Sequence, residues 1–349
     1  MSKINVRSPY FINHTATNLT SATLEIVIYV GAVNTSFGTP QYTLVSTALD
    51  AKVNFEVSEL IKDYIQTKFN GTFPTPTVTD EEATTIFVDY RITQTIVTTT
   101  TVLTPVYGNR AFYGYGYFED GANPSFDSIF SLQSNTSILK NTNATVTIPV
   151  DNTIATSLVW KYQGSPVSTI SIAAETKIEN QITYVTNTGN FNVDQAEISA
   201  SLKTITINID SYEKCKYTPL KLIFINKFGA YQEIWMFANS ILSMATTEER
   251  YKSNILTNGT YNTYDPQIKL LTKNANQTLK LNSDYYPESY NEVFRQLFLS
   301  EKVWIDYNGE TLGVNIESKQ ITYKTSLTDS LINYTIDVSF AFDTINNIR

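Results

Sequence analysis

The chain has very few of the side chains on which most enzyme active sites and disulfide-stabilised folds depend. Its 349 residues include one cysteine, Cys215, and one histidine, His14. A single cysteine permits no internal disulfide, so the fold does not depend on an oxidising compartment. A single histidine excludes two-histidine metal motifs, and we interpret His14 as an ordinary surface residue. Without a histidine base beside it, Cys215 is interpreted as a structural thiol.

Charged residues are also scarce. They make up 17% of the chain, against roughly 25% in an average soluble domain, and the net charge is −8. An acidic chain gains no counterion-release energy on nucleic acid and is not attracted to an anionic membrane surface. No run of 18 apolar residues exists, and residues 1–6 hold no apolar signal region. We therefore expect neither nucleic-acid binding, nor a membrane span, nor a secretory signal.

The residues that are abundant favour strands. Thr, Asn, Ser and Ile are common, and there are 23 Tyr and 18 Phe. This composition predicts a mainly β protein of tandem antiparallel β-sandwich-like modules with a few short helices. A length of 349 residues, at about 100–200 residues per domain, suggests two or three modules. We predict a β module with a short helix over 1–110, a second β module over 111–245 and an α+β module over 246–349.

Alternating apolar residues predict individual strands. The clearest patterns lie near residues 24–29, 53–57, 86–92, 98–101, 146–149, 158–160, 204–209, 321–325 and 332–342. Two hairpins are also predicted. One runs over 220–237 with Asn226 and Gly229 in its connection, and the other over 303–316 around Asn308-Gly309.

Two short helices are predicted. The first covers 58–65, with Ser58 as its N-cap. The second covers 290–300 and follows a capping box in which Ser289 caps the helix and Glu292 reaches back to it. Its apolar stripe consists of Val293, Phe294, Leu297 and Phe298.

A stretch of aromatic residues and glycines, Tyr107–Phe118, is the candidate contact loop, and we call it the aromatic loop. Tyrosine provides large contact area at low entropic cost, which suits a partner surface. The alternative is an inter-domain loop whose rings cover a core. We predict an oligomer whose contacts use this loop, because glycines at 108, 114 and 116 should keep its backbone loose. The candidate residues are Tyr107, Phe112, Tyr113, Tyr115, Tyr117 and Phe118.

We predict that the chain is not an enzyme and has no catalytic, cofactor-binding or metal-binding residues. Paired carboxylates are the one remaining route to catalysis, and Glu119-Asp120 is the best pair. Adjacent residues of an extended chain point to opposite sides, which weakens that pair. Asp80-Glu81-Glu82 is interpreted as a solvated charge run. No calcium-loop pattern or glycine-rich phosphate loop is present in the sequence.

Two blocks of sequence have a recognisable pattern. The first is Cys215–Pro219 running into Phe224–Tyr231. The second comprises Tyr290-Asn291-Glu292, Leu297, Leu299-Ser300-Glu301 and Leu331–Thr335. Both blocks resemble virion structural proteins of tailed phages that infect Bacteroidetes-type bacteria. The resemblance covers about residues 212–349. It implies a tail, baseplate or neck component located in the virion, made in the host cytoplasm, with other virion proteins and its own copies as partners. It implies no catalytic residues.

Three hypotheses about function follow. The first is a structural protein that assembles in repeated copies as a ring. The second is a receptor- or glycan-binding module of the virion surface that contacts a host glycan through the aromatic loop. The third is a carboxylate-based glycan hydrolase. Position in the particle separates the first two hypotheses, and turnover of a host polysaccharide would select the third.

Overall fold

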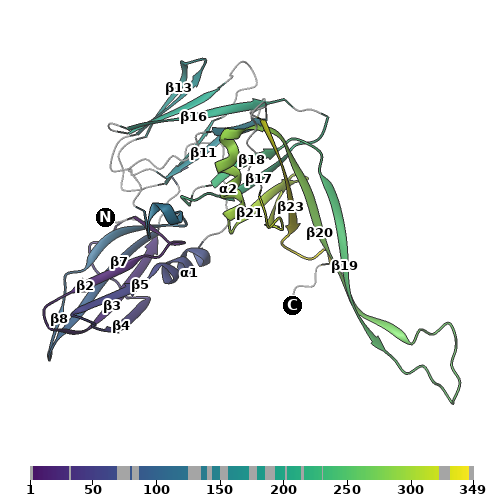
Figure 1. Ribbon diagram of the computed structural model, residues 1–349, viewed down its shortest axis with the longest axis horizontal. Helices are drawn as coiled ribbons and strands as arrows, with labels where there is room; N and C mark the ends of the chain where they lie inside the picture. The colour runs from purple at the N-terminus through teal and green to yellow at the C-terminus, as the bar shows by residue number, and fades with distance from the viewer. Residues whose placement is uncertain are drawn as a thin grey trace. The chain divides into compact units, whose positions relative to one another are not determined.

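The protein is mainly β, as Figure 1 shows. The computed structural model describes residues 3–30, 33–68, 79–80, 86–124, 135–139, 144–149, 156–172, 179–184, 193–200, 203–213, 216–229, 231–321 and 331–345. Within these residues the strands form several sheets, most of their pairings antiparallel, and the α-helices have 11 and 9 residues. The predicted fold class is therefore confirmed. Neither described helix is long and apolar enough to cross a bilayer.

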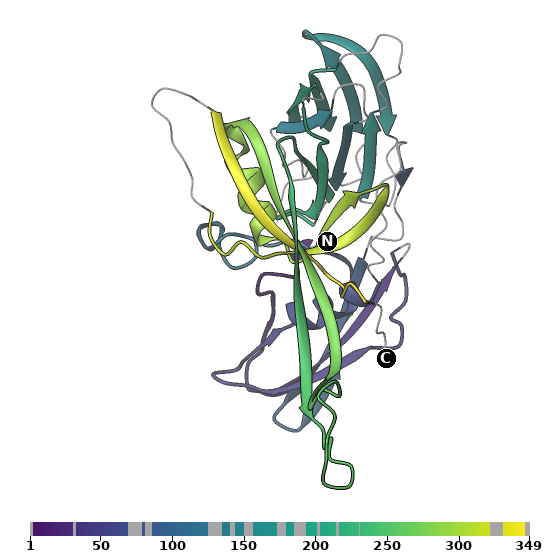
Figure 2. The ribbon, with the colours of Figure 1, turned by 90° about the vertical axis from the view of Figure 1, so that its right-hand side faces the viewer.

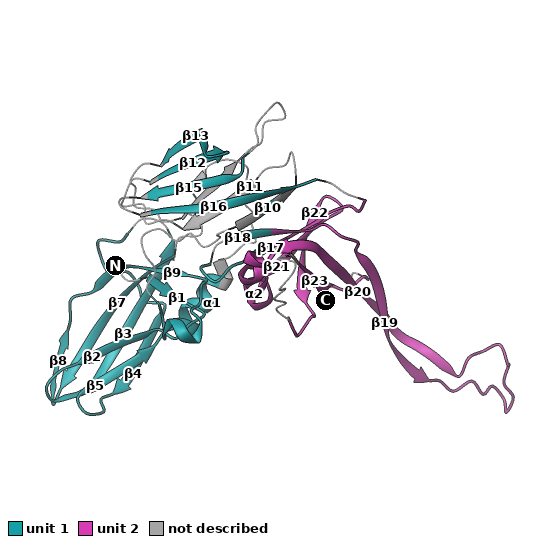
Figure 3. Cartoon of the chain, turned by 45° about the horizontal axis from the view of Figure 1, so that its top comes forward, with its two compact units in different colours: residues 1–213, 224–233 teal, residues 214–223, 234–349 magenta. Residues whose placement is uncertain are grey.

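The chain divides into two compact units, shown in Figure 3. Unit 1 comprises residues 1–213 and 224–233, and unit 2 comprises residues 214–223 and 234–349. The three-module division with boundaries at 110 and 245 stays a prediction.

The first sheet of unit 1 has the strand order β1-β9-β7-β3-β4, and β8 also pairs with β7. Leu24, Ile26 and Ile28 alternate along β3 and are fully buried, which confirms the predicted pattern. A separate two-stranded ribbon joins β2 and β5. The bounds are β1 (Lys3–Asn5), β2 (Phe11–Thr15), β3 (Leu19–Val30), β4 (Tyr42–Thr47), β5 (Lys52–Glu56), β7 (Ile86–Ile96), β8 (Thr99–Val102) and β9 (Val106–Phe112).

Helix α1 (Ser58–Lys68) follows β5 directly, as predicted. Ile61 and Ile65 are buried on its inner face. The Ile61 N–H donates to the Val57 carbonyl, so the helix hydrogen bonds begin one residue before Ser58. The Ser58 hydroxyl bonds back to the Glu56 carboxylate. The predicted Ser58 N-cap is therefore wrong, because Val57 occupies that position.

Two further sheets complete unit 1. One has the order β10-β16-β15-β12-β13, and the other β11-β14-β6. Trp160, Ile198 and Ile207 are fully buried in the first of them. The bounds are β6 (Thr79–Asp80), β10 (Asn135–Leu139), β11 (Ala144–Pro149), β12 (Thr156–Tyr162), β13 (Ser165–Ile172), β14 (Glu179–Tyr184), β15 (Gln195–Ala200) and β16 (Lys203–Tyr212).

Unit 2 is built on a seven-stranded sheet with the order β18-β17-β21-β22-β23-β20-β19. Residues 224–233, around the turn between β17 and β18, count with unit 1. Both predicted hairpins form, and Asn308 and Gly309 adopt the positive φ of 54° and 83° that their turn needs. The bounds are β17 (Leu220–Ile225), β18 (Tyr231–Met236), β19 (Ile241–Lys252), β20 (Ile268–Pro287), β21 (Val303–Tyr307), β22 (Glu310–Ile316) and β23 (Leu331–Phe340).

Helix α2 (Asn291–Leu299) packs an aromatic cluster against this sheet. The Phe294 ring lies 4.2 Å from that of Tyr334 and 5.7 Å from that of Tyr286, centroid to centroid. The helix itself is confirmed, but the predicted capping box is wrong. Ser289 lies inside a 3-10 turn, Glu288–Tyr290, and α2 starts after Tyr290 with no side-chain cap. The turn continues into the helix, which leaves Ser289 one residue too early to cap it.

Several predictions fall outside the described residues. They include Cys215, the charges Glu81 and Glu82, and the part of the predicted strand 321–325 that follows residue 321.

Candidate contact surfaces

The first half of the aromatic loop is a β-strand, although its composition predicts a loop. Its first residues, through Phe112, belong to β9, which pairs with both β1 and β7. Phe112, Tyr113 and Tyr115 are buried, Tyr107 and Tyr117 are half-buried, and Phe118 is completely exposed. The prediction of a loose backbone is therefore wrong for the stretch from 107 to 115. Three of the six rings fill the interior of unit 1.

Glycine serves close packing in this segment. A Cβ on Gly114 would stand 2.8 Å from Asn5 Oδ1 and 2.8 Å from the Lys227 carbonyl oxygen. The Tyr115 N–H donates to that same carbonyl at 2.7 Å. The turn 226–229 thus lies directly against the backbone of residues 113–115, with no room for a side chain at 114.

Cations and amides complete this packing. The Arg7 guanidinium lies 4.6 Å from the centre of the Tyr115 ring, and Lys227 Nζ lies 4.4 Å from that of Tyr117. The Asn123 side-chain amide donates to the carbonyl oxygens of Asn5 and Ser8. Contacts of this kind hold Tyr115, Tyr117 and the N-terminal residues 5–8 in place.

The carboxylate pair Glu119-Asp120 lies just beyond the aromatic rings, in the 3-10 turn Phe118–Asp120. Asp120 accepts a hydrogen bond from the Tyr117 N–H at 3.0 Å and faces Lys227 Nζ at 3.4 Å. These contacts give Asp120 a structural role in its turn. His14, interpreted as a surface residue, is half-buried in β2, with Nε2 2.7 Å from Gln94 Oε1.

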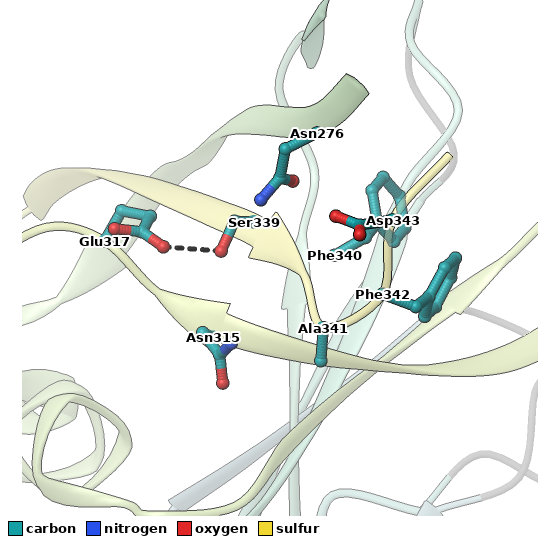
Figure 4. A pocket seen from close by; sticks show the side chains of 8 residues that line it. All are labelled: Asn276, Asn315, Glu317, Ser339, Phe340, Ala341, Phe342 and Asp343. Carbon is teal, nitrogen blue, oxygen red and sulfur yellow. Dashed lines mark hydrogen bonds between the residues drawn. The ribbon is translucent and has the colours of Figure 1, made fainter. Parts of the chain in front are cut away.

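A shallow polar hollow of about 400 Å³ lies at the ends of β22 and β23 in unit 2 (Figure 4). The Ser339 hydroxyl donates to the Glu317 carboxylate within it. No histidine or lysine is among its lining residues. It is lined by Asn276, Asn315, Glu317, Ser339, Phe340, Ala341, Phe342 and Asp343.

Many of the exposed large apolar side chains in the described part of the chain lie elsewhere, on the β19–β20 hairpin, residues 241–280, which we call the arm. Figures 1 and 2 show it running out beyond the other strands of its sheet. All twelve residues of β19 are exposed. The large apolar side chains with high exposure are Ile241, Leu242, Met244, Tyr251, Leu256, Tyr261, Tyr264, Ile268, Leu270 and Leu271.

The tip of the arm is a tight turn. Thr257 and Thr260 exchange both backbone hydrogen bonds, at 2.9 and 3.1 Å. Asn258 and Gly259 between them adopt φ of 55° and 79°, as a two-residue hairpin turn requires. Tyr264 beside it is 83% exposed.

Sequence analysis did not predict the arm. The available signal was Asn258-Gly259, a strong hairpin turn sequence between two strand-forming stretches. Apolar residues in a strand normally indicate a buried face, and nothing in a single sequence distinguishes Met244 or Ile268 from core residues.

Comparisons with known proteins add little. No protein-family model matches the chain, and no curated protein matches it. One solved structure that resembles it is the crystal structure of the teleost fish polymeric Ig receptor ectodomain. That match has 9% sequence identity, covers 61% of this chain and 95% of the receptor chain, and has a TM-score of 0.23. A score this low carries no argument about function.

Proposed function

We propose that this chain is a structural component of a tailed-phage virion, in the tail, baseplate or neck, and that it acts through protein–protein assembly, not catalysis. The exposed arm is the observation that carries this proposal. Large apolar side chains gathered in an exposed position on one hairpin are typical of a surface that a neighbouring subunit covers. The arm also falls inside residues 212–349, the region that resembles virion structural proteins.

Purified particles from a host that carries the gene provide the test. We expect mass spectrometry to find the chain in repeated copies per particle, and electron microscopy to place it among neighbouring subunits. Particles that form normally and lack the chain would overturn the proposal.

A receptor- or glycan-binding module is the second candidate, supported by the exposed rings of Tyr261 and Tyr264 at the tip. Exposed aromatic faces at the end of a projection suit stacking on a sugar or a host protein. This candidate requires the tip to be distal in the particle and free of neighbours. Replacing both tyrosines with serine would then abolish adsorption to host cells while leaving particles intact.

A further inference from the structure

Both faces of the outer part of the arm, residues 248–273, are open, and so is the outer edge of β19. The register pairs Leu242 with Leu279 and Arg250 with Leu270, so alternation places Leu242, Met244, Ile268 and Leu270 on one face. Ile241 and Tyr251 lie on the other face. β19 is also the last strand of its sheet, so the backbone groups along its outer side have no strand to pair with in the described chain.

An isolated two-stranded ribbon is marginally stable in water. In the arm, β19 and β20 nevertheless form twelve cross-strand residue pairs, with one bulge between Glu249 and Arg250. Such a ribbon gains lasting order when another surface covers its apolar side chains. A long, open edge strand without a partner is in addition a site of uncontrolled association.

The dimensions of the arm match a stable interface. Twelve residues of strand extend about 40 Å, and a ribbon of two strands is about 10 Å wide. Covering the face of Ile241 and Tyr251 therefore buries roughly 800 Å² over both partners, and covering the open outer part of the other face raises the total to roughly 1,200 Å². This value lies at the lower end of the range for specific, stable interfaces.

The charge of the arm indicates the partner. Residues 241–280 hold five basic side chains (Arg250, Lys252, Lys269, Lys273 and Lys280) and three acidic ones (Glu248, Glu249 and Asp265), a net charge of +2. The whole chain has 25 basic and 33 acidic residues. The remainder therefore has 20 and 30, a net charge of −10. Opposite net charges attract an arm to the remainder of another molecule.

Two lysines are available for that attraction. Glu248 is engaged by Arg250 and lies 3.9 Å from Lys273, and Asp265 lies 3.5 Å from Lys269. Lys252 and Lys280 make no ion pair within the described residues.

We propose that the arm of one copy docks on the acidic remainder of a second copy of this chain, through its apolar faces and its lysines. This inference names a partner for the proposed assembly function and rests on that function for its setting. Because the donor and acceptor surfaces differ, each copy can give an arm and receive one, which builds rings or chains of subunits.

Light scattering of the purified full chain, from about 1 to 100 μM, tests the inference. We expect concentration-dependent oligomers in 50 mM salt that weaken in 500 mM salt. Lys252→Glu with Lys280→Glu should weaken association at least about tenfold, and so should Met244→Thr with Ile268→Thr and Leu270→Thr. All five positions are exposed, so the melting temperature should not change. A wild-type chain that stays monomeric throughout overturns the inference.

Matched controls come from the same chain. Lys319→Glu changes an exposed lysine outside the arm, and Val45→Thr with Val102→Thr changes exposed strand valines of unit 1. These variants should associate as the wild type does. If they weaken association as much as the arm variants, the contact is not made by the arm.

A shortened chain tests whether the arm binds the remainder of a second copy or another arm. Residues 248–273 include no buried residue, so replacing them with Asn-Gly removes no part of the core. The shortened chain should be monomeric alone, with an unchanged melting temperature, and should form mixed complexes with the full chain. If it forms none while the full chain self-associates, arms pair with arms and the inference is wrong. Particles that contain the chain and assemble with arm variants would overturn this inference and leave the proposed function standing.

Discussion

The buried carboxylate of Asp89 accepts a hydrogen bond from the Gly108 N–H at 2.7 Å. The same carboxylate accepts from the Tyr29 hydroxyl at 3.2 Å and from the Asn34 side-chain amide at 3.3 Å. Asp89 sits where the pairing of β7 with β9 is irregular, between Val88 and Tyr90. The carboxylate thus provides an acceptor where the strands offer none, and it fixes the first residues of the aromatic loop.

Replacing Asp89 with alanine should destabilise unit 1 by about 2–3 kcal/mol, because the buried Gly108 N–H and the half-buried donors of Tyr29 and Asn34 lose their acceptor. Asp89→Asn keeps one acceptor oxygen and the same shape, so its loss should be smaller. Urea denaturation of both variants measures the difference. Equal losses for alanine and asparagine would show that the charge, and not the acceptor geometry, matters.

Gly114→Ala should destabilise unit 1 by about 1–3 kcal/mol, since its Cβ would meet Asn5 and the Lys227 backbone at 2.8 Å. Gly38→Ala is the matched control, because its Cβ would lie in ordinary contact, 3.4 Å from Val27. Thermal unfolding of the two variants should differ clearly. An unchanged midpoint for Gly114→Ala would mean that the turn 226–229 does not lie against residue 114.

Sequence patterns predicted the strands well where one face is buried. Ile205, Ile207 and Ile209 alternate in sequence, and β16 has Ile207 and Ile209 in its core. The Asn308-Gly309 turn was also predicted, since its positive φ values demand such residues. Patterns of this kind are local, so a single sequence contains them.

The candidate surfaces were harder to predict because they depend on distant contacts. The packing of Tyr113 and Tyr115 depends on Arg7 and on Lys227, far away in sequence. In the arm the error is the reverse. Its apolar residues have the sequence pattern of buried strand residues, but they are exposed. Both outcomes arise from tertiary arrangement, which composition and periodicity do not contain.

Ser289→Ala should leave unit 2 within about 0.5 kcal/mol of the wild type, because the exposed Ser289 makes no cap hydrogen bond. Asn291→Ala is the informative partner. It removes the acceptor of the Tyr334 hydroxyl and should cost about 1–2 kcal/mol. Chemical denaturation of the two variants checks both values, and a larger loss for Ser289→Ala would restore the predicted capping box.

Alkaline pH should weaken unit 1 through Tyr29. Burial raises the pKa of Tyr29 to about 12 from its ordinary value of 10.0, and the Asp89 carboxylate adds to the rise. Above pH 10 the unfolded chain loses this proton before the folded chain does, so the folded state binds more protons. Stability from this group is complete below pH 10 and is lost as pH rises toward 12. Denaturation midpoints at several pH values should therefore fall more steeply for the wild type than for Tyr29→Phe, and parallel curves would exclude this contribution.

Phe118 is the fully exposed ring of the aromatic loop, so a contact between this loop and a neighbouring subunit would depend on it. Tyr115→Ser removes a buried ring and should destabilise unit 1 by about 3–5 kcal/mol. Phe118→Ser removes a fully exposed ring and should not lower the melting temperature. If the loop contacts a neighbouring subunit, the Phe118 ring is buried in that contact. Phe118→Ser will then reduce incorporation into particles, because it removes this apolar contact area. Val97→Ser, at a residue 64% exposed in a turn of the same unit, is the control and should be incorporated normally. Normal incorporation of Phe118→Ser, together with the expected instability of Tyr115→Ser, would mean that the aromatic loop serves internal packing alone and that assembly contacts lie on other surfaces.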